Sequence, residues 1–269
     1  MIIDTHSRET LQKSICSYFH LTENNLHDLF NNLYYSSIEL EQAIAEYVLE
    51  NASAPLDGIQ FYHLSRRLNG SNLKSGNNLY DLLLNKSIIS DFLKKYGIHF
   101  EKGTDHLLLY HNEKLTTFKH SSYGNTAYLK WRLGYFKDDE DYCFNGFALR
   151  DCLQHNTSYF NPLSVCPEFI SQLAQVLNKE SMIWDYYENS NYYCLEYVLP
   201  LDMVIIDGQE HIKSQIGKSQ VLLEASLLRL YHYWLNPKYA FDNDNVILRL
   251  HDTDSMDEQY FVTAERLKI

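Results

Sequence analysis

The sequence lacks the cysteine patterns of disulfide frameworks and zinc ribbons. Its five cysteines are odd in number and no two form a C-x-x-C pair, so we expect neither kind of fold and take a reducing cytosol as the simplest compartment. The Walker A, G-x-G-x-x-G, G-x-S-x-G and H-E-x-x-H motifs are also missing. Their absence removes the best-marked routes to a nucleoside triphosphatase, a dinucleotide-binding fold, an esterase and a zinc protease.

Long apolar runs are missing as well. None approaches the roughly 18 residues that a helix needs to cross a bilayer, and the N-terminal residues Met1 to His6 form neither a basic nor an apolar signal region. We therefore expect no membrane partner and a cytoplasmic chain, with delivery by a specialised secretion system left open.

Positive charge is scarce. With 23 lysines and arginines against 35 aspartates and glutamates, the formal net charge is −12 at pH 7. This charge opposes the phosphate backbone of nucleic acids, so a non-specific nucleic-acid ligand is not expected. A protein partner, and a basic one in particular, fits the charge better, as does a small ligand held by a few local cations.

Glycine is scarce too, with ten residues against 22 tyrosines. Apolar residues make up 45% of the chain, which is enough to bury a sizeable core. Tyrosine offers a large contact area and a polar tip at low entropic cost, so its abundance favours a surface used for recognition.

The first 53 residues show the spacing of short amphipathic helices. Ser36 and Glu39, which have the spacing of a capping box, precede the third of three apolar stripes. The three stripes are Leu11, Ile15, Tyr18 and Phe19; Leu26, Leu29, Phe30 and Leu33; and Leu40, Ile44, Tyr47 and Val48. Small residues, a proline and a glycine in Asn51 to Gly58 are typical of a boundary. We predict a helical N-terminal appendage, residues 1–55, before an α+β domain, residues 56–269.

In the second domain, short apolar runs alternate irregularly with helical patterns. Helices are predicted at about 78–95, 167–178 and 218–235, and strands at 59–64, 97–101, 106–111, 143–149, 192–199, 202–206, 245–251 and 259–264. Residues 252–258 have the composition of a hairpin loop between the last two strands. Because strands and helices do not alternate regularly, the pattern favours a mixed β-sheet flanked by helices.

The strand at 59–64 is followed by polar residues that suit a ligand site. His63 and Ser65 are two residues apart and therefore share one face of a strand, so both can reach one ligand. Arg66, placed just past the expected strand end, can pair with a phosphate. A second apolar run, Tyr96 to Phe100, follows and contains Gly97 and His99.

These two runs resemble the nicotinamide-binding strands of ADP-ribosyltransferases of the histidine-tyrosine-glutamate type. The resemblance implies that His63 and Ser65 bind the nicotinamide ribose of NAD, that Arg66 holds the pyrophosphate, and that His99 stacks on nicotinamide in place of the family's tyrosine. Leu64 stands where the family has glycine, which normally lets the amide of nicotinamide approach the backbone.

The family's third element is a late glutamate that stabilises the cation formed as nicotinamide leaves. The run Asp257 to Val262 resembles its surroundings, and either Glu258 or Gln259 occupies the catalytic position. If Glu258 does, the resemblance implies an active mono-ADP-ribosyltransferase; if Gln259 does, it implies a weak or inactive one. The long separation from His99 implies an insertion at roughly 110–235.

Other candidates have structural interpretations. The acidic run Asp138 to Asp141 lacks the glycine and terminal glutamate of a calcium loop and indicates a solvated turn. Asn145-Gly146 indicates a bulge or a hairpin, and Arg150 after it is a second candidate for a phosphate. Cys166 precedes a helix, and we expect a buried cysteine there.

Two hypotheses follow. The first is a mono-ADP-ribosyltransferase that uses NAD, with Glu258 and His63 as catalytic residues and a macromolecular acceptor. The second is a non-enzymatic, acidic and tyrosine-rich module that binds another protein, as regulators, immunity proteins and inhibitors do. A transferase fold kept for binding after the loss of activity would combine them.

Overall fold

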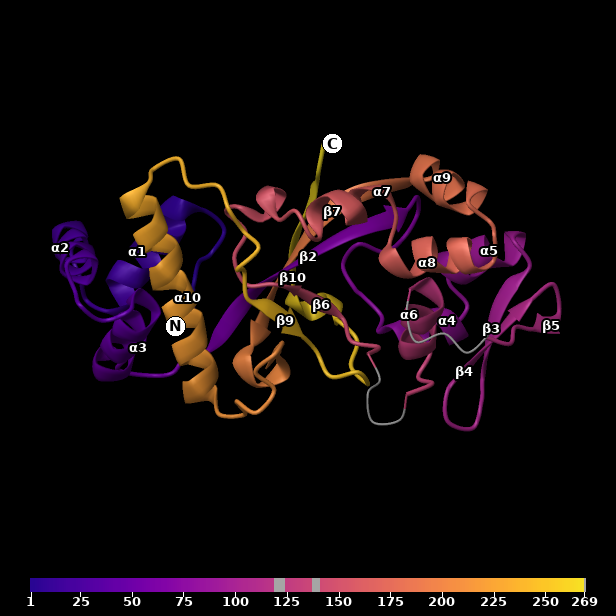
Figure 1. Cartoon of the computed structure of the whole chain (residues 1–269), viewed down its shortest axis with the longest axis horizontal. Coiled ribbons are helices and arrows are strands. Elements are labelled where there is room, and N and C mark those ends of the chain that lie inside the picture. The colour runs from indigo at the N-terminus through magenta and orange to yellow at the C-terminus, as the bar shows by residue number, and fades with distance from the viewer. Residues whose placement is uncertain (119–123, 137–140, 269) are drawn as a thin grey trace. The chain divides into compact units, whose positions relative to one another are not determined.

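The computed structural model describes residues 1–118, 124–136 and 141–268 and has an α+β fold (Figure 1). The prediction of a mixed sheet with flanking helices is therefore confirmed. The chain forms two compact units. The first comprises Met1–Tyr62, Asn145–Ser158 and Glu196–Arg249, and the second comprises His63–Phe144, Tyr159–Leu195 and Leu250–Ile269.

The first unit contains the three helices predicted in the first 53 residues. They are α1 (Arg8–Tyr18), α2 (Glu23–Tyr34) and α3 (Leu40–Asn51). Ser7 and Thr22 begin α1 and α2 with reciprocal capping boxes, in which the side chain of each cap accepts from the third helical amide. The predicted box at Ser36 and Glu39 is wrong, because Ser36 accepts from Ile38 instead and α3 has no side-chain cap.

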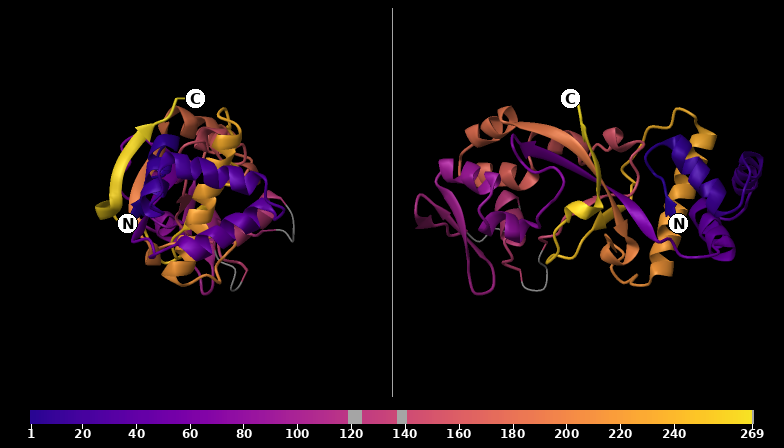
Figure 2. Two further views of the ribbon diagram at one scale, coloured as in Figure 1. Left: turned by 90° about the vertical axis from the view of Figure 1, so that its left-hand side faces the viewer. Right: turned by 180° about the vertical axis from the view of Figure 1, so that it is seen from behind.

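The inner faces of these helices pack against the long helix α10 (Gln215–Leu235), around which Figures 1 and 2 show them grouped. Leu26 and Phe30 of α2 and Ile44 and Val48 of α3 are buried in this way. The helices therefore share a core with a segment that comes almost 200 residues later. The boundary of the first unit does not follow the predicted boundary at residues 55–56.

Within the described residues, one seven-stranded sheet has the order β10-β7-β2-β6-β9-β8, with β1 beside β2. β1 is parallel to β2, whereas the pairs β2–β6, β6–β9 and β8–β9 are antiparallel. The strands are β1 (Ile2–Ile3), β2 (Gly58–Leu68), β6 (Asn145–Phe147), β7 (Ser190–Pro200), β8 (Ile205–Ile206), β9 (Ile247–Arg249) and β10 (Phe261–Arg266). β2 and β7 contribute residues to both units.

A smaller, three-stranded sheet lies in the second unit and has the order β3-β4-β5 among the described residues. Its strands and the helices of this unit enclose a core that includes Leu83, Phe92, Leu109 and Leu173. The elements are α4 (Leu79–Leu84), α5 (Ile88–Lys95), β3 (Ile98–Lys102), β4 (Leu107–His111), β5 (Lys114–Leu115), α6 (Asn125–Arg132), α7 (Phe160–Val165), α8 (Glu168–Val176) and α9 (Ser181–Glu188). Short 3-10 helices are η1 (Leu153–His155), η2 (Leu201–Met203) and η3 (Glu258–Tyr260).

Three details of the predicted elements change. The helix expected at 78–95 is divided into α4 and α5, because Asn85 ends the first and Ser87 caps the second. The hairpin expected at 252–258 is wrong, because β9 and β10 are separated in the sheet by β6, β2 and β7. Asn145-Gly146 is not a turn but lies inside β6, opposite Arg249 and Leu248.

Gly146 is required by close packing. A Cβ atom there would lie 2.5 Å from the Phe61 ring and 2.6 Å from the carbonyl oxygen of Tyr62, so only glycine lets β6 approach β2 at this point.

A buried ionic network stabilises the first unit. Arg229 of α10 donates to Asp151 and Asp242, at 2.8 Å each, and its side chain is 2% exposed. Asn156 and Asn245 also donate to Asp242, whose pKa is raised by burial. The network joins α10 to residues 151–156 and 242–245, and every buried charge in it has a partner.

No helix within the described residues is both long and apolar enough to cross a membrane.

Candidate functional site

The candidate site begins on β2, where His63 and Ser65 lie on a half-exposed face of the strand. Leu64 and Arg66 alternate with them and are buried, at 4% and 6% exposure. Leu64 therefore directs its side chain away from the face that carries His63 and Ser65. The expected position of Arg66 is wrong, because β2 continues to Leu68 and Arg66 lies within the strand.

Arg66 is held by one hydroxyl and several carbonyl oxygens on its own side of the strand. Its Nε donates to Ser190 Oγ at 2.8 Å, its Nη1 to the carbonyl of Ser164 at 2.6 Å, and its Nη2 to the carbonyl of Tyr187 at 2.7 Å. The guanidinium also lies 4.0 Å from the centre of the Tyr187 ring. All three nitrogens are engaged, so this arrangement connects β2 to α7, α9 and β7. To hold a pyrophosphate, Arg66 would have to exchange these partners.

His63 contacts an aromatic ring from the segment before β6. The imidazole and the ring of Phe144 have centroids 4.1 Å apart and planes inclined by 30°. Phe144 is fixed in turn, since its carbonyl accepts from Leu250 at 3.0 Å and its ring covers Gly76. A Cβ atom on Gly76 would lie within 2.8 Å of this ring, so the ring and the backbone approach closely.

Gly76, which packs against Phe144, also binds the segment that carries Glu258. Gly76 and Met256 exchange two backbone hydrogen bonds, of 3.1 and 2.6 Å. Asn78 donates to Ser255 Oγ at 3.2 Å, which fixes the same segment again. The loop before η3 is therefore attached to the residues that cover Phe144.

Glu258 is the first residue of η3 and is exposed, as is Gln259. The carboxylate of Asp257 caps η3 by accepting from the amide of Gln259 at 2.9 Å. Their exposure leaves both candidate side chains accessible to a ligand.

His99 lies on a different sheet from His63. It is half-buried on β3, and its ring stacks on Tyr110 of β4 with centroids 4.9 Å apart and planes 4° from parallel. β3 and β2 are not neighbouring strands among the described residues. Of the predicted nicotinamide contacts, the structure thus places His63 and Ser65 on one strand face and His99 elsewhere in the unit.

The remaining sequence candidates have other surroundings. Arg150 belongs to the first unit, whereas His63 belongs to the second. Cys166 is buried, as expected, and burial raises the pKa of its thiol to about 12. Asp138, Asp139 and Glu140 lie outside the described residues.

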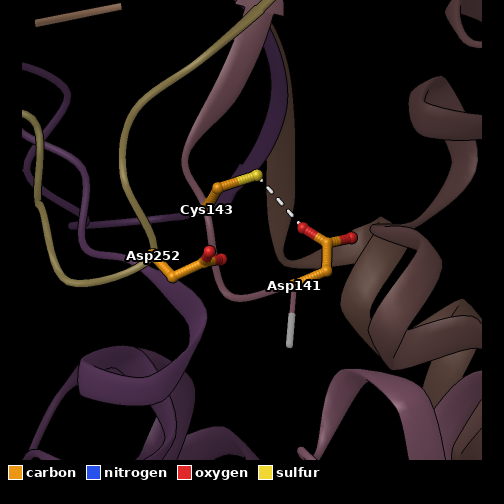
Figure 3. Close-up of side chains that lie close together, drawn as sticks. All are labelled: Asp141, Cys143 and Asp252. Carbon is orange, nitrogen blue, oxygen red and sulfur yellow. Dashed lines mark hydrogen bonds between the residues drawn. The ribbon is translucent and has the colours of Figure 1, made fainter. Parts of the chain in front are cut away.

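Asp141 belongs to a small group that could be mistaken for a metal centre. A carboxylate oxygen of Asp141, the Sγ atom of Cys143 and a carboxylate oxygen of Asp252 all lie within 4.8 Å of one another. Figure 3 shows the Asp252 carboxylate directed toward the other two side chains. Asp141 is ion-paired with Arg132, and the Cys143 thiol donates to Asp141 Oδ1 at 3.1 Å. Asp252 Oδ1 accepts from the amide of Tyr142 at 2.6 Å.

These partners favour a structural role for the group. Burial raises the pKa of the Cys143 thiol to about 12, and the sulfur donates its proton to Asp141. Arg132 already neutralises Asp141. The group attaches the segment that precedes Phe144 to the loop that precedes Met256, and it thereby supports the surroundings of His63.

Two residues near the site were missed by the sequence analysis. Arg67 shares the half-exposed face of β2 with His63 and Ser65, and the alternation of the strand would have shown this had β2 been extended to Leu68. Phe144 gave no local signal, because it reaches His63 from a segment about 80 residues later.

The first unit contains an open pocket of about 630 Å³ at the N-terminus of α10. None of the predicted site residues line it.

No protein-family model, curated protein or solved structure matches the chain.

Proposed function

We propose that the chain is an NAD-dependent mono-ADP-ribosyltransferase that acts on a macromolecular acceptor. The observation that supports this most is the series of contacts from His63 through Phe144 and Gly76 to Met256, two residues before Glu258. His63 belongs to β2 and Glu258 to η3, almost 200 residues later in the sequence. The resemblance requires both residues at one site, and this series of contacts connects the segments that carry them.

The residues of β2 suit part of an NAD molecule. His63 and Ser65 offer an imidazole and a hydroxyl on one half-exposed face, which matches the hydroxyl groups of a ribose. The ring of Phe144 beside His63 supplies an apolar surface for a flat heterocycle. Arg66 does not fit the predicted pyrophosphate contact in this arrangement, so Arg67 is the better placed cation on that face.

The chemistry assigned to this chain is the exchange of one bond to C1′ of the nicotinamide ribose. The bond between C1′ and the nicotinamide nitrogen breaks, and its electron pair leaves with nicotinamide. An oxygen or nitrogen of the acceptor forms the new bond to C1′ and loses its proton to solvent. Glu258 acts by placing a carboxylate beside the positive charge that develops on the ribose, while His63 orients the ribose.

The test is release of nicotinamide from NAD, measured by chromatography, together with mass spectrometry of any ADP-ribosylated protein. Glu258→Gln and His63→Ala should each lower the rate by about 100-fold or more, because each removes a group that acts on the reacting ribose. Gln259→Ala should leave the rate within about threefold if Glu258 supplies the catalytic carboxylate.

The control is His155→Ala, which removes an exposed histidine from the first unit and should leave the rate unchanged. Full activity in the Glu258→Gln variant would contradict the assignment. A wild-type protein that is folded and releases no nicotinamide would contradict the proposed activity itself.

A further inference from the structure

The outer surfaces of α2 and α3 carry charge of one sign. No lysine or arginine occurs between Lys13 and Arg66. Within the same interval, six carboxylates belong to α2, α3 and the cap of α3, and all six are exposed: Glu23, Asp28, Glu39, Glu41, Glu46 and Glu50. Exposed surfaces usually intersperse both signs, so this concentration is unusual.

Among the residues that the structure describes, none of these six carboxylates forms an ion pair. Two cations of the adjacent helix α10 are already committed elsewhere, since Lys218 donates to the carbonyls of Leu201 and Val204, and Arg229 binds Asp151 and Asp242. The negative potential of the two helices is therefore directed to solvent.

Large apolar side chains are exposed among the same carboxylates. Tyr34 and Tyr35 at the end of α2 are 52% and 82% exposed, Ile38 is 42% exposed, and Leu49 on α3 is 69% exposed. The rings of Tyr34 and Tyr35 meet edge to face at 5.1 Å, and Tyr34 also contacts Trp234 of α10 at 6.0 Å. Tyr34 thus packs against both neighbouring rings, while both tyrosines keep more than half of their surface exposed.

These exposed residues are not part of the core. Leu26 and Phe30 bury the inner face of α2, and Ile44 and Val48 bury the inner face of α3. The exposed surface of the tyrosines, the isoleucine and the leucine is available to a partner.

We propose that the outer surface of α2 and α3, defined by these six carboxylates with Tyr34, Tyr35, Ile38 and Leu49, binds a lysine- and arginine-rich segment of another protein. Carboxylates of one sign attract and orient a basic segment, tyrosine faces receive its cations, and Leu49 and Ile38 receive one or two apolar side chains. α3 has 12 residues and is about 18 Å long, which suits a segment of three or four helical turns. The site is independent of the proposed transferase activity.

The probe is a fluorescein-labelled 12-residue peptide with lysine or arginine at two positions in three and leucine at the others. Its binding to the full chain is followed by fluorescence anisotropy at low and at physiological salt. The expected result is binding that weakens as salt is added, because exposed charges are screened. The same peptide with glutamate in place of the cations should not bind.

Two variants with the same change in net charge separate the site from the overall charge. The site variant carries Glu39→Gln, Glu41→Gln, Glu46→Gln and Glu50→Gln. The control variant carries four substitutions at exposed acids of the second unit: Asp91→Asn, Glu113→Gln, Glu180→Gln and Glu188→Gln. The site variant should lose at least about tenfold in affinity, and the control variant less than about twofold.

A third variant, Tyr34→Ala with Tyr35→Ala, keeps the charge and should lose about tenfold in affinity, since aromatic side chains contribute strongly at interfaces. Equal losses in the site and control variants would overturn the proposal in favour of net charge alone. Absence of peptide binding at low salt would also overturn it. So would concentration-dependent dimerisation that the tyrosine variant abolishes, because the occupant would then be a second copy of the chain.

Discussion

Replacement of Arg66 by methionine tests whether this residue supports the fold or binds a ligand. Methionine keeps much of the length and the apolar stem of arginine but provides no donor. The change removes hydrogen bonds to Ser190 Oγ and to the carbonyls of Ser164, Tyr187 and Ser190. These acceptors lie around a side chain of 6% exposure, so water replaces the lost donors poorly.

The expected cost follows from these contacts. A buried acceptor that loses its donor costs about 1–3 kcal/mol, and partial solvation and relaxation reduce the sum for three carbonyls to about 4 kcal/mol. For a chain of this size, a loss of about 4 kcal/mol lowers Tm by about 8–16 °C. Arg66→Lys keeps the charge but cannot donate to all the acceptors at once, and it should cost about half as much.

The assay is thermal and urea unfolding followed by far-UV circular dichroism. The control is Arg266→Met, which removes the same charge from an exposed position on β10 and should change stability by less than about 0.5 kcal/mol. An Arg66→Met variant with unchanged stability that loses affinity for NAD would refute the structural role and restore the predicted pyrophosphate contact.

Three further substitutions or modifications test other parts of the structure. Arg229→Met should lower the free energy of chemical unfolding by about 3–5 kcal/mol, because it leaves buried carboxylates unpaired. Arg249→Met, at a more exposed ion pair, should lower it by less than about 1 kcal/mol. Equal losses in the two variants would contradict the network. Iodoacetamide at pH 8 should leave Cys143 unmodified in the folded protein, because burial raises its thiol pKa to about 12, and rapid labelling found by mass spectrometry would show an exposed thiolate. Gly146→Ala should lower the free energy of unfolding by about 1–3 kcal/mol through overpacking against β2. This loss should exceed that of Gly208→Ala, where nothing lies within 4 Å of the added methyl group. Unchanged stability of Gly146→Ala would show that the strands separate easily.

Much of the secondary structure was predictable because its signals are local. The three N-terminal helices and α10 follow apolar stripes of helical spacing, and β3 and β4 follow two runs joined by a short turn. Three helices were missed. α6, α7 and α9 are six to eight residues long, and their short apolar patterns cannot be distinguished from those of loops.

Strand neighbours and side-chain partners were less predictable because they depend on distant segments. The hairpin expected between β9 and β10 failed because pairing in this sheet is non-local. Arg66 lies within β2, although the predicted strand ends at residue 64. Its acceptors come from residues 98 to 124 positions later, and no local pattern indicates that carbonyls would satisfy it there.

The candidate site shows the same division. The shared face of His63 and Ser65 follows from the two-residue period of a strand and is found in the structure. The ring of Phe144 over His63, and the attachment of Gly76 to Met256, arise from segments that meet only after folding. The choice between Glu258 and Gln259 depends on a ligand that neither sequence nor fold contains.

The most direct test of the proposed function is calorimetric titration of NAD into the purified protein, beside the His63→Ala variant. The account predicts micromolar binding, about −8 kcal/mol, that is lost in this variant and kept in the His155→Ala control. A folded protein that gives neither heat nor a thermal shift with NAD, or a His63→Ala variant that binds NAD as well as the wild type, would contradict it.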